Sequence, residues 1–373
     1  MKDLGHEETE RLIKRMTADV QKVYLQASKE VQAKLDDYFR RFEIKDEIWV
    51  RKVANGEAKK EDYIKWRQSQ LMVGQRWETL QQKLSEELHQ SNVTARKLVD
   101  QYRAEAYAVN FNYGTFLVET QSKIDTAFTL YNREAVERII REEPELLPPP
   151  GFQSIPTKFD RYKAGEEVKL TAEEKKAFDV ALAADKDIRW QKGQIQSVTM
   201  QAIVQGESIP NFAKRIARDM GEINHKSTIR YARTAMTGAQ NAGRVDSFHR
   251  ADELGIDMEQ VWVSVLDGRT RYEHRQLDGM RVKVGEPFKV DGYTIMFPGD
   301  PSAPPEMVYN CRCGVWAQVK GWKTDLSRRS LADLDGMSYD EWKNSHKEQS
   351  RSITYQEEVG NAMKWKYINE RYK

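Results

Sequence analysis

Ser264-Val-Leu-Asp-Gly-Arg-Thr-Arg-Tyr-Glu-His274 is the first of three motifs that lie within Val261–Val319. The second is Leu277-Asp-Gly279, and the third is Asn310-Cys-Arg-Cys313, which contains both cysteines of the chain. Glycines and short polar residues in these motifs favour turns over helices. We therefore expect an irregular segment here around which the rest of the chain is organised.

Short strands are predicted around these motifs, because apolar and polar residues alternate there. The predicted strands are Gln260–Val265, Phe288–Val290, Tyr293–Phe297 and Gly314–Val319. The Asp-Gly pair between the middle two is a strong hairpin signal, since both positions tolerate positive φ. The expected fold class is α+β, with a long-helix N-terminal region followed by helices packed on a small antiparallel sheet.

Nearly everything upstream of the motifs predicts helix. Apolar residues from Ile13 to Phe42 recur at steps of three and four, which places them in one stripe along a helix of about thirty residues. The usual mean length of a helix is about eleven or twelve residues. A stripe of this length requires a partner helix.

Turn and capping signals divide the remaining helical stretches. Asn55-Gly56 interrupts the first stretch, a second helix covers Glu61–His89, and Ser91 or Asn92 is expected to cap a third. The prolines of Pro144–Gly151 end a helix over Asn132–Glu142 and mark the clearest boundary.

Later helices follow the same signals. The expected features are a capping box at Thr171 and Glu174, a helix opened by Ser208 and Pro210 and closed by Gly221, a helix over Lys226–Leu254 stopped by Gly255, and tail helices over Ser338–Lys347 and Tyr355–Tyr372. Together the signals predict four segments: 1–150 (helical N-terminal region), 151–225 (helical connecting region), 226–320 (α+β domain) and 321–373 (polar helical tail).

Composition bounds the function class. The 373 residues carry 60 basic and 58 acidic side chains, so the net charge of +2 gives no whole-chain argument for nucleic-acid binding. No run of about 18 apolar residues is present, so we expect a soluble protein without a membrane partner. Two cysteines separated by a single residue do not form a secreted disulfide framework, which favours a reducing compartment.

In order and spacing, the three motifs resemble those of the phage head morphogenesis family named after the F protein of phage Mu. Members also carry an Arg-Thr pair inside a long helix, which Arg233-Thr234 matches, so the resemblance extends from there to Cys313. The motif residues carried over are Arg233, Thr234, Asp267, Gly268, Arg269, Thr270, Arg271, His274, Leu277, Asp278, Gly279, Asn310 and Arg312.

The resemblance implies a structural minor head protein, present in few copies and located in the virion, inside the head near the portal vertex. Its implied partners are the portal protein, capsid or scaffold proteins and phage DNA, with roles in procapsid assembly and in DNA packaging or delivery. The N-terminal helices, with their apolar stripe, are expected to bind the portal or other copies of the chain. Genome contact is expected through Arg230–Arg250 and Lys320–Arg329.

Three interpretations of the motif residues compete. In the structural one, Asp267 and Asp278 accept bidentate hydrogen bonds from arginines that lock the turn against the sheet. In the metal one, His274, Cys311 and Cys313 bind a structural zinc ion, with an aspartate or water as fourth ligand. A metal would supply folding free energy to a sheet with a small core.

The third interpretation is catalytic. His274 would act as general acid or base, Arg269 or Arg271 as an anion clamp, and Glu306 or Asp278 as partner, as in a nuclease. The chain has no Gly-rich phosphate loop and no nucleophile elbow. We therefore expect a protein that is not an enzyme, with phosphate chemistry centred on His274 as the alternative.

Overall fold

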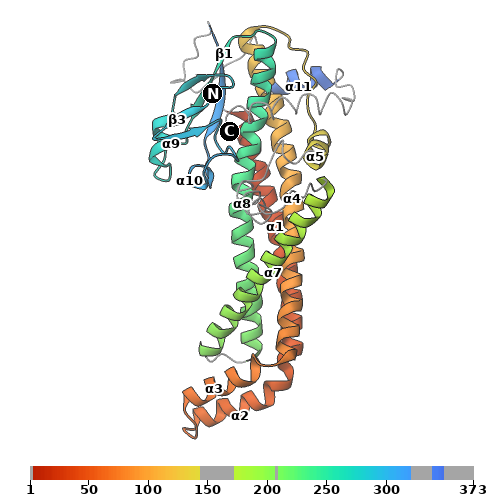
Figure 1. Ribbon diagram of the computed structural model, residues 1–373, viewed down its shortest axis with the longest axis vertical. Coiled ribbons are helices and arrows are strands. Elements are labelled where there is room, and N and C mark those ends of the chain that lie inside the picture. Colours follow the sequence, from red (N-terminus) through yellow and green to blue (C-terminus); the bar gives the residue numbers. More distant parts are fainter. Residues whose placement is uncertain (1–2, 143–171, 206–208, 321–337, 348–373) are drawn as a thin grey trace, which may run out of the picture. The chain divides into compact units, whose positions relative to one another are not determined.

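The computed structural model describes residues 3–142, 172–205, 209–320 and 338–347. Its helices are α1 (Leu4–Phe39), the short 3-10 helix η1 (Arg40–Phe42), α2 (Glu43–Ala54), α3 (Lys60–Leu71), α4 (Gln75–Ser122), α5 (Arg133–Glu142), α7 (Ala172–Gln205), α8 (Ile209–Glu253), α9 (Tyr272–Leu277), α10 (Pro305–Val308) and α11 (Tyr339–Lys347) (Figure 1). The strands are β1 (Met258–Val263), β2 (Arg281–Lys283), β3 (Phe288–Val290), β4 (Tyr293–Ile295) and β5 (Gly314–Val319). The predicted α+β class is confirmed. None of the described helices is long and apolar enough to cross a bilayer.

The chain divides into two compact units, each built from separate stretches of sequence. Unit 1 comprises Met1–Met16, Val99–Gly165 and Arg230–Lys373, and unit 2 comprises Thr17–Leu98 and Glu166–Ile229. The units do not follow chain order, because α1, α4 and α8 each contribute residues to both. The division into four consecutive segments stays a prediction.

Unit 2 is a helical bundle whose core contains the apolar stripe of α1. Val31, Leu35 and Phe39 have no exposed surface. They pack in one cluster with residues of α4, α7 and α8, among them Leu84, Ile203 and Phe212. Each such side chain contributes about 1.5–3 kcal/mol through burial. The predicted stripe is therefore present, but its expected use as an external binding surface is wrong, because its partner helices belong to the same unit.

The predicted helix over Glu61–His89 is wrong at two points, because it breaks between α3 and α4, where Gly74 has φ 83°, and because α4 continues past His89. Ser91 and Asn92 lie inside the continuous helix α4. The Ser91 hydroxyl donates to the Glu87 carbonyl over 2.9 Å, while Asn92 accepts a hydrogen bond from Tyr24 over 2.7 Å and donates to Asp187 over 3.1 Å. Ser91 thus bonds back within α4, and Asn92 joins α4 to α1 and α7 rather than capping a helix. The break after Asn55-Gly56 is confirmed, with Gly56 at φ 74°.

Gly221 was expected to end a helix, yet it lies in the middle of α8. A Cβ atom at this position would lie 2.1 Å from the Ser28 hydroxyl of α1. The glycine therefore permits close approach of two helices, and its role is packing rather than termination. The other signals of α8 hold, since Pro210 lies in its first turn and Gly255 follows its end at φ 85°.

Unit 1 holds the sheet, which lies beside α8 (Figure 1). Strand β1 pairs antiparallel with both β2 and β5, giving the order β2-β1-β5. The hairpin of β3 and β4 is confirmed, with Asp291 and Gly292 at φ 45° and 82°. Two side chains of neighbouring helices bind the sheet. The Asn241 side chain of α8 accepts a hydrogen bond from the Val315 backbone amide over 2.9 Å, and the Gln121 side chain of α4 accepts one from the Val319 backbone amide over 3.0 Å.

Remaining helix starts also match their signals. Asn132 accepts from the Ala135 amide over 2.8 Å at the start of α5. Ser338 and Glu341 form a reciprocal capping box at the start of α11. Five predicted features lie wholly or mostly outside the described residues: the proline boundary at Pro144–Gly151, Thr171, Ser208, the genome contact at Lys320–Arg329 and the helix over Tyr355–Tyr372.

Candidate metal centre and motif turn

The three motifs meet in unit 1 because β1 and β5 are neighbours. The first motif leaves the end of β1, and the third leads into the beginning of β5. The register pairs Val263 with Gly314, so the two chain segments meet at one edge of the strands. Helix α9 begins within the first motif, at Tyr272, and ends at Leu277, which is fully buried.

A bidentate ion pair locks the turn after β1. Arg312 donates from Nη1 to Asp267 Oδ2 over 2.8 Å and from Nη2 to Oδ1 over 2.7 Å. The Arg269 amide also donates to Oδ1 over 2.9 Å. The Arg312 hydrogen bonds, and then that amide, hold the pKa of Asp267 well below its usual range. This is the geometry of the structural interpretation, and Arg312 of the third motif is the arginine that supplies it.

Side chains of the first motif, and Arg275 directly after it, donate to neighbouring main-chain oxygens. Thr270 donates to the Val265 carbonyl, and Arg271 donates to the Tyr309 carbonyl. Arg275 donates to the Thr270 carbonyl over 3.1 Å. Arg269, in contrast, is 78% exposed. The turn is thus fixed mainly by side chains that donate to main-chain oxygens.

Asp278 does not receive an arginine in this structure. Its Oδ1 accepts from the Ser264 amide over 2.7 Å, which closes the segment between β1 and α9. Gly279 follows at φ 75° and donates its amide to the Trp262 carbonyl over 2.8 Å. The expected arginine pair at Asp278 is therefore wrong. This carboxylate, at the end of α9, accepts a hydrogen bond from the Ser264 amide instead.

One face of α8 holds the third motif in place. The Asn310 amide donates to the Thr234 hydroxyl over 3.1 Å. Thr237 donates to the Cys311 carbonyl over 2.8 Å, and Asn241 donates to the Cys313 carbonyl over 3.1 Å. Thr234 of the Arg-Thr pair thus contacts the motif, while Arg233 is exposed. Sequence reasoning missed Thr237 and Asn241, although their spacing from Thr234 by three and seven residues places them on the same face.

His274, Cys311 and Cys313 form a buried cluster in which the ligand atoms all lie within 4.8 Å of one another. His274 Nδ1 lies 3.6 Å from Cys311 Sγ and 3.4 Å from Cys313 Sγ. The three residues are at most 3% exposed. The structure therefore brings together the three ligands that the sequence offers for a metal.

The two thiols differ in acidity because they interact with each other. A hydrogen bond from the Cys311 side chain, aided by His274, lowers the pKa of Cys313. The same pairing, together with burial, raises the pKa of Cys311. The His274 ring packs edge-to-face on Trp262, with ring centroids 5.4 Å apart, and its Nε2 atom has no hydrogen-bond partner among the described residues. The cluster thus combines a readily ionised thiol with a fixed imidazole.

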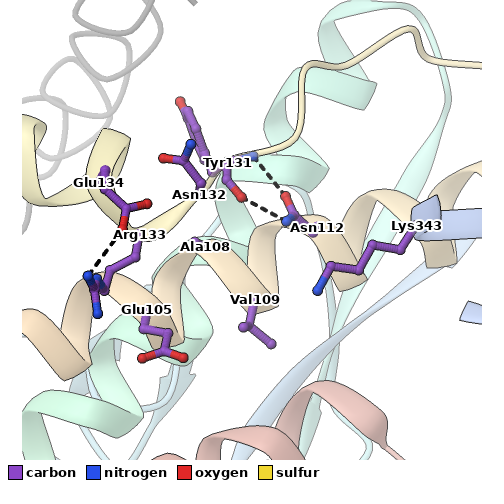
Figure 2. Close-up of a pocket in the computed structure, with 9 residues that line it drawn as sticks. All are labelled: Glu105, Ala108, Val109, Asn112, Tyr131, Asn132, Arg133, Glu134 and Lys343. Atoms are coloured by element: carbon purple, nitrogen blue, oxygen red, sulfur yellow. Dashed lines mark hydrogen bonds and ion pairs between the residues drawn. The ribbon is translucent and has the colours of Figure 1, made fainter. Parts of the chain in front are cut away.

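The catalytic interpretation requires an open site at His274, and this residue is only 1% exposed. One described cavity, of about 370 Å³, lies between α4, the segment around Tyr131 and Lys343 of α11 (Figure 2). There Asn112 exchanges two hydrogen bonds of 2.9 Å with the Tyr131 backbone. A larger cavity of about 800 Å³ lies in unit 2 between α1 and α8. No motif residue lines either of these two cavities, so neither cavity gives a polymer substrate access to His274.

Two arginines of the Arg230–Arg250 stretch, which was expected to contact DNA, are buried or paired. Arg244 is fully buried, and its guanidinium contacts Asp3, Asn110 and the Val315 carbonyl. Arg250 is paired with Asp246 over 3.2 Å. The expected contact of these two arginines with DNA is wrong, since their side chains serve the interior of unit 1.

Replacing Asp267 with asparagine is expected to lower the free energy of unfolding at pH 7, with the deficit narrowing below about pH 4. The pKa of this carboxyl is depressed in the folded state, so its stabilisation is complete above the unfolded value of about 3.9 and is lost as the pH falls through the folded value. Urea denaturation of both proteins at pH 7, 5 and 3 measures the difference. The control is Asp257→Asn, which removes an exposed pair with Lys320. A deficit unchanged at pH 3 would contradict the assignment.

Comparison with known proteins gives two kinds of match. The family model described as Phage Mu protein F like protein matches residues 193–316, from within α7 to β5, and includes all three motifs. Minor head protein GP7 of Bacillus phage SPP1 is 22% identical over 336 residues, which cover 87% of this chain and 91% of that protein.

An enzyme matches over a shorter stretch. NAD(+)--arginine ADP-ribosyltransferase EFV of Enterococcus faecalis (strain ATCC 700802 / V583) is 32% identical over 152 residues, which cover 39% of this chain. This chain spans 31% of that enzyme's length. No solved structure matches. The motifs, their meeting point beside α8 and these matches agree: residues 193–316 match the Mu F-like family, and most of the chain is similar to a phage minor head protein.

Proposed function

We propose that this chain is a non-enzymatic minor head protein that acts in procapsid assembly at the portal vertex and becomes part of the virion. The observation that carries the proposal is the extent of the likeness to minor head protein GP7, which covers 87% of this chain. A likeness confined to the Mu F-like domain would leave the helical unit unexplained. The burial of His274 supports a structural role for the motifs.

We further propose that the α2–α3 hairpin of unit 2 binds the portal protein. Ile44 and Ile48 lie one turn apart on α2 and are 76% and 48% exposed. Exposed apolar residues at helical spacing are suited to a protein interface. The apolar stripe of α1 is buried and cannot provide this surface. We therefore assign portal binding to the hairpin.

The hairpin is rigid behind its exposed face. Arg67 of α3 donates to both oxygens of Asp46 of α2, each over 2.9 Å, and Tyr63 donates to the same carboxylate over 2.8 Å. Trp49 and Trp66 stack with ring centroids 6.0 Å apart. A pre-organised support of this kind lowers the entropy cost of binding.

The double variant Ile44→Glu, Ile48→Glu is expected to reduce co-purification of the portal protein at least about tenfold, which corresponds to about 1.4 kcal/mol or more of lost binding free energy. Both carboxylates would remain solvated in the free protein, so helix content by circular dichroism should not change. Co-expression with a tagged portal protein, followed by quantification in purified procapsids, provides the measurement.

Leu25→Glu is the control for added charge, because Leu25 is 55% exposed on α1 and the substitution places one carboxylate elsewhere in unit 2. Its portal recovery should equal that of the wild type. Full portal recovery with the hairpin variant would overturn the proposed surface, and loss with both variants would point to a general effect of charge.

Association with capsid or scaffold proteins, self-association and a role in DNA packaging or delivery are further proposals. Light scattering of the purified chain tests self-association. For DNA, Arg230 and Arg233 remain exposed after Arg244 and Arg250 are set aside as buried or paired. Binding that weakens steeply with salt and is lost in the Arg230→Gln, Arg233→Gln variant would support contact there.

A further inference from the structure

We propose that His274, Cys311 and Cys313 bind a zinc ion that fastens helix α9 to the start of strand β5. The proposal rests first on distance. The two nitrogen-to-sulfur separations are 3.6 and 3.4 Å. In tetrahedral zinc sites the Zn–S and Zn–N bonds are about 2.3 and 2.0–2.1 Å, which places neighbouring nitrogen and sulfur ligands about 3.5 Å apart. Both nitrogen-to-sulfur separations therefore match those between neighbouring ligands of a zinc tetrahedron.

The ligand types also select zinc. Two thiolates and one imidazole are soft or borderline donors, which suit zinc and exclude magnesium and calcium, ions that prefer oxygen ligands. Two thiolate charges would neutralise a divalent ion. Neutrality matters because the three residues are at most 3% exposed, and an isolated charge in such surroundings is costly.

Surrounding hydrogen bonds fix the ligands without using their metal-facing atoms. Ser264 donates to the His274 carbonyl over 2.6 Å. The carbonyls of Cys311 and Cys313 accept from Thr237 and Asn241, as described above. These bonds restrain the backbone on both sides of the cluster, so binding need not order it. Pre-ordered ligands of this kind are a feature of structural metal sites.

The fourth coordination position falls to water. Asp267 is held by Arg312, and Asp278 accepts the Ser264 amide. The Ser264 hydroxyl, although 3.6 Å from Cys313 Sγ, already donates to the His274 carbonyl and accepts from Trp262. The aspartates that the sequence offers as a fourth ligand are thus committed to other partners.

Zinc would stabilise the part of unit 1 with the least apolar core. Strands β2, β3 and β4 have three residues each. His274 and Cys311 are separated by 37 positions, so one ion would close a long loop. Closing a loop of this length costs conformational entropy. The free energy of metal binding would offset that cost.

The test uses the full chain, purified without chelator from zinc-supplemented cells. Elemental analysis is expected to find about one zinc ion per chain in the wild type, and less than about a tenth of that in His274→Ala and in Cys313→Ser. His225→Ala is the matched control, because His225 also has a buried Nε2 atom without a hydrogen-bond partner among the described residues and lies outside the cluster. It should retain the zinc.

Cobalt substitution identifies the ligands independently of variant folding. Adding Co²⁺ to chelated wild-type protein should produce thiolate-to-cobalt charge-transfer absorption, which Zn²⁺ should displace. Chelation should lower the melting temperature, and Zn²⁺ should restore it. Folded wild-type protein that contains no zinc and gives no such absorption would overturn the proposal, as would zinc retained in both cluster variants.

Discussion

Replacing Arg244 with alanine is expected to lower the free energy of unfolding by about 3–5 kcal/mol, the usual cost of removing one partner from a buried ion pair. The side chain has no exposed surface, so no water can replace the lost guanidinium without rearrangement. Its partner Asp3 is only 16% exposed. The variant therefore removes the guanidinium donor from a carboxylate and from two neutral acceptors inside unit 1.

The size of this effect follows from how many segments Arg244 joins. Its Nη2 donates to Asp3 before α1, its Nε to Asn110 of α4 over 3.0 Å, and its Nη1 to the Val315 carbonyl of β5 over 3.3 Å. Its guanidinium also lies over the Tyr113 ring, 5.6 Å from the centroid. One side chain of α8 thus holds two other helical segments and the sheet.

Urea denaturation followed by circular dichroism at pH 7 provides the measurement. Arg233→Ala is the control, because Arg233 is exposed on the same helix, and its effect should stay within about 0.5 kcal/mol. Burial would raise the pKa of Asp3, but Arg244 lowers it, and the net shift is downward. The deficit should therefore shrink below about pH 4, where the unfolded carboxyl is protonated. Equal denaturation midpoints for the two variants would contradict the assignment.

Structural features that depend only on residues close together in the sequence could be predicted. The Asp291-Gly292 hairpin needs only two residues that accept positive φ, and both adopt it. The end of α8 needs only Gly255. The four predicted strands are all present and in the predicted order, although β1 begins two residues earlier than expected, at Met258, and a fifth strand, the short β2, was missed. A strand of three residues contains too few alternations to give a clear periodic signal.

Features that depend on distant contacts could not be predicted. Asn92 has the residue type of a helix cap, but Tyr24 and Asp187 use it inside α4. Gly221 has the residue type of a helix end, but Ser28 occupies the space that its missing side chain leaves. Each of these residue types can either end a helix or make a contact inside one. Only the packing of other helices decides which occurs.

The candidate site shows the same division. The residue types of His274, Cys311 and Cys313 suggested a metal site, and antiparallel pairing of β1 with β5 brings them together. That Arg312 rather than Arg269 or Arg271 makes the bidentate pair with Asp267 could not be foreseen. Arg312 and Asp267 are 45 positions apart, and strand register alone determines which arginine faces the carboxylate.

Leu35→Glu is expected to unfold unit 2, because the free energy lost is comparable with the whole stability of a typical domain. Leu35 has no exposed surface and packs in the core formed by α1, α4, α7 and α8. Losing a buried leucine costs about 2–5 kcal/mol, and an unpaired carboxylate placed there adds several more. Typical domains have about 5–15 kcal/mol in total. Circular dichroism and limited proteolysis should show loss of helix and rapid cleavage within residues 17–98.

Ile48→Glu adds the same charge on α2, where the side chain is 48% exposed, and should leave helix content unchanged. The pair of variants separates core from interface. Both are expected to reduce portal recovery, Leu35→Glu by unfolding and Ile48→Glu while folded. A Leu35→Glu protein that kept its helix content but lost the portal would show that the stripe of α1 faces a partner, contrary to its burial in unit 2. Retention of both helix content and portal recovery by Leu35→Glu would instead show that this position tolerates charge, which is incompatible with a packed core around α1.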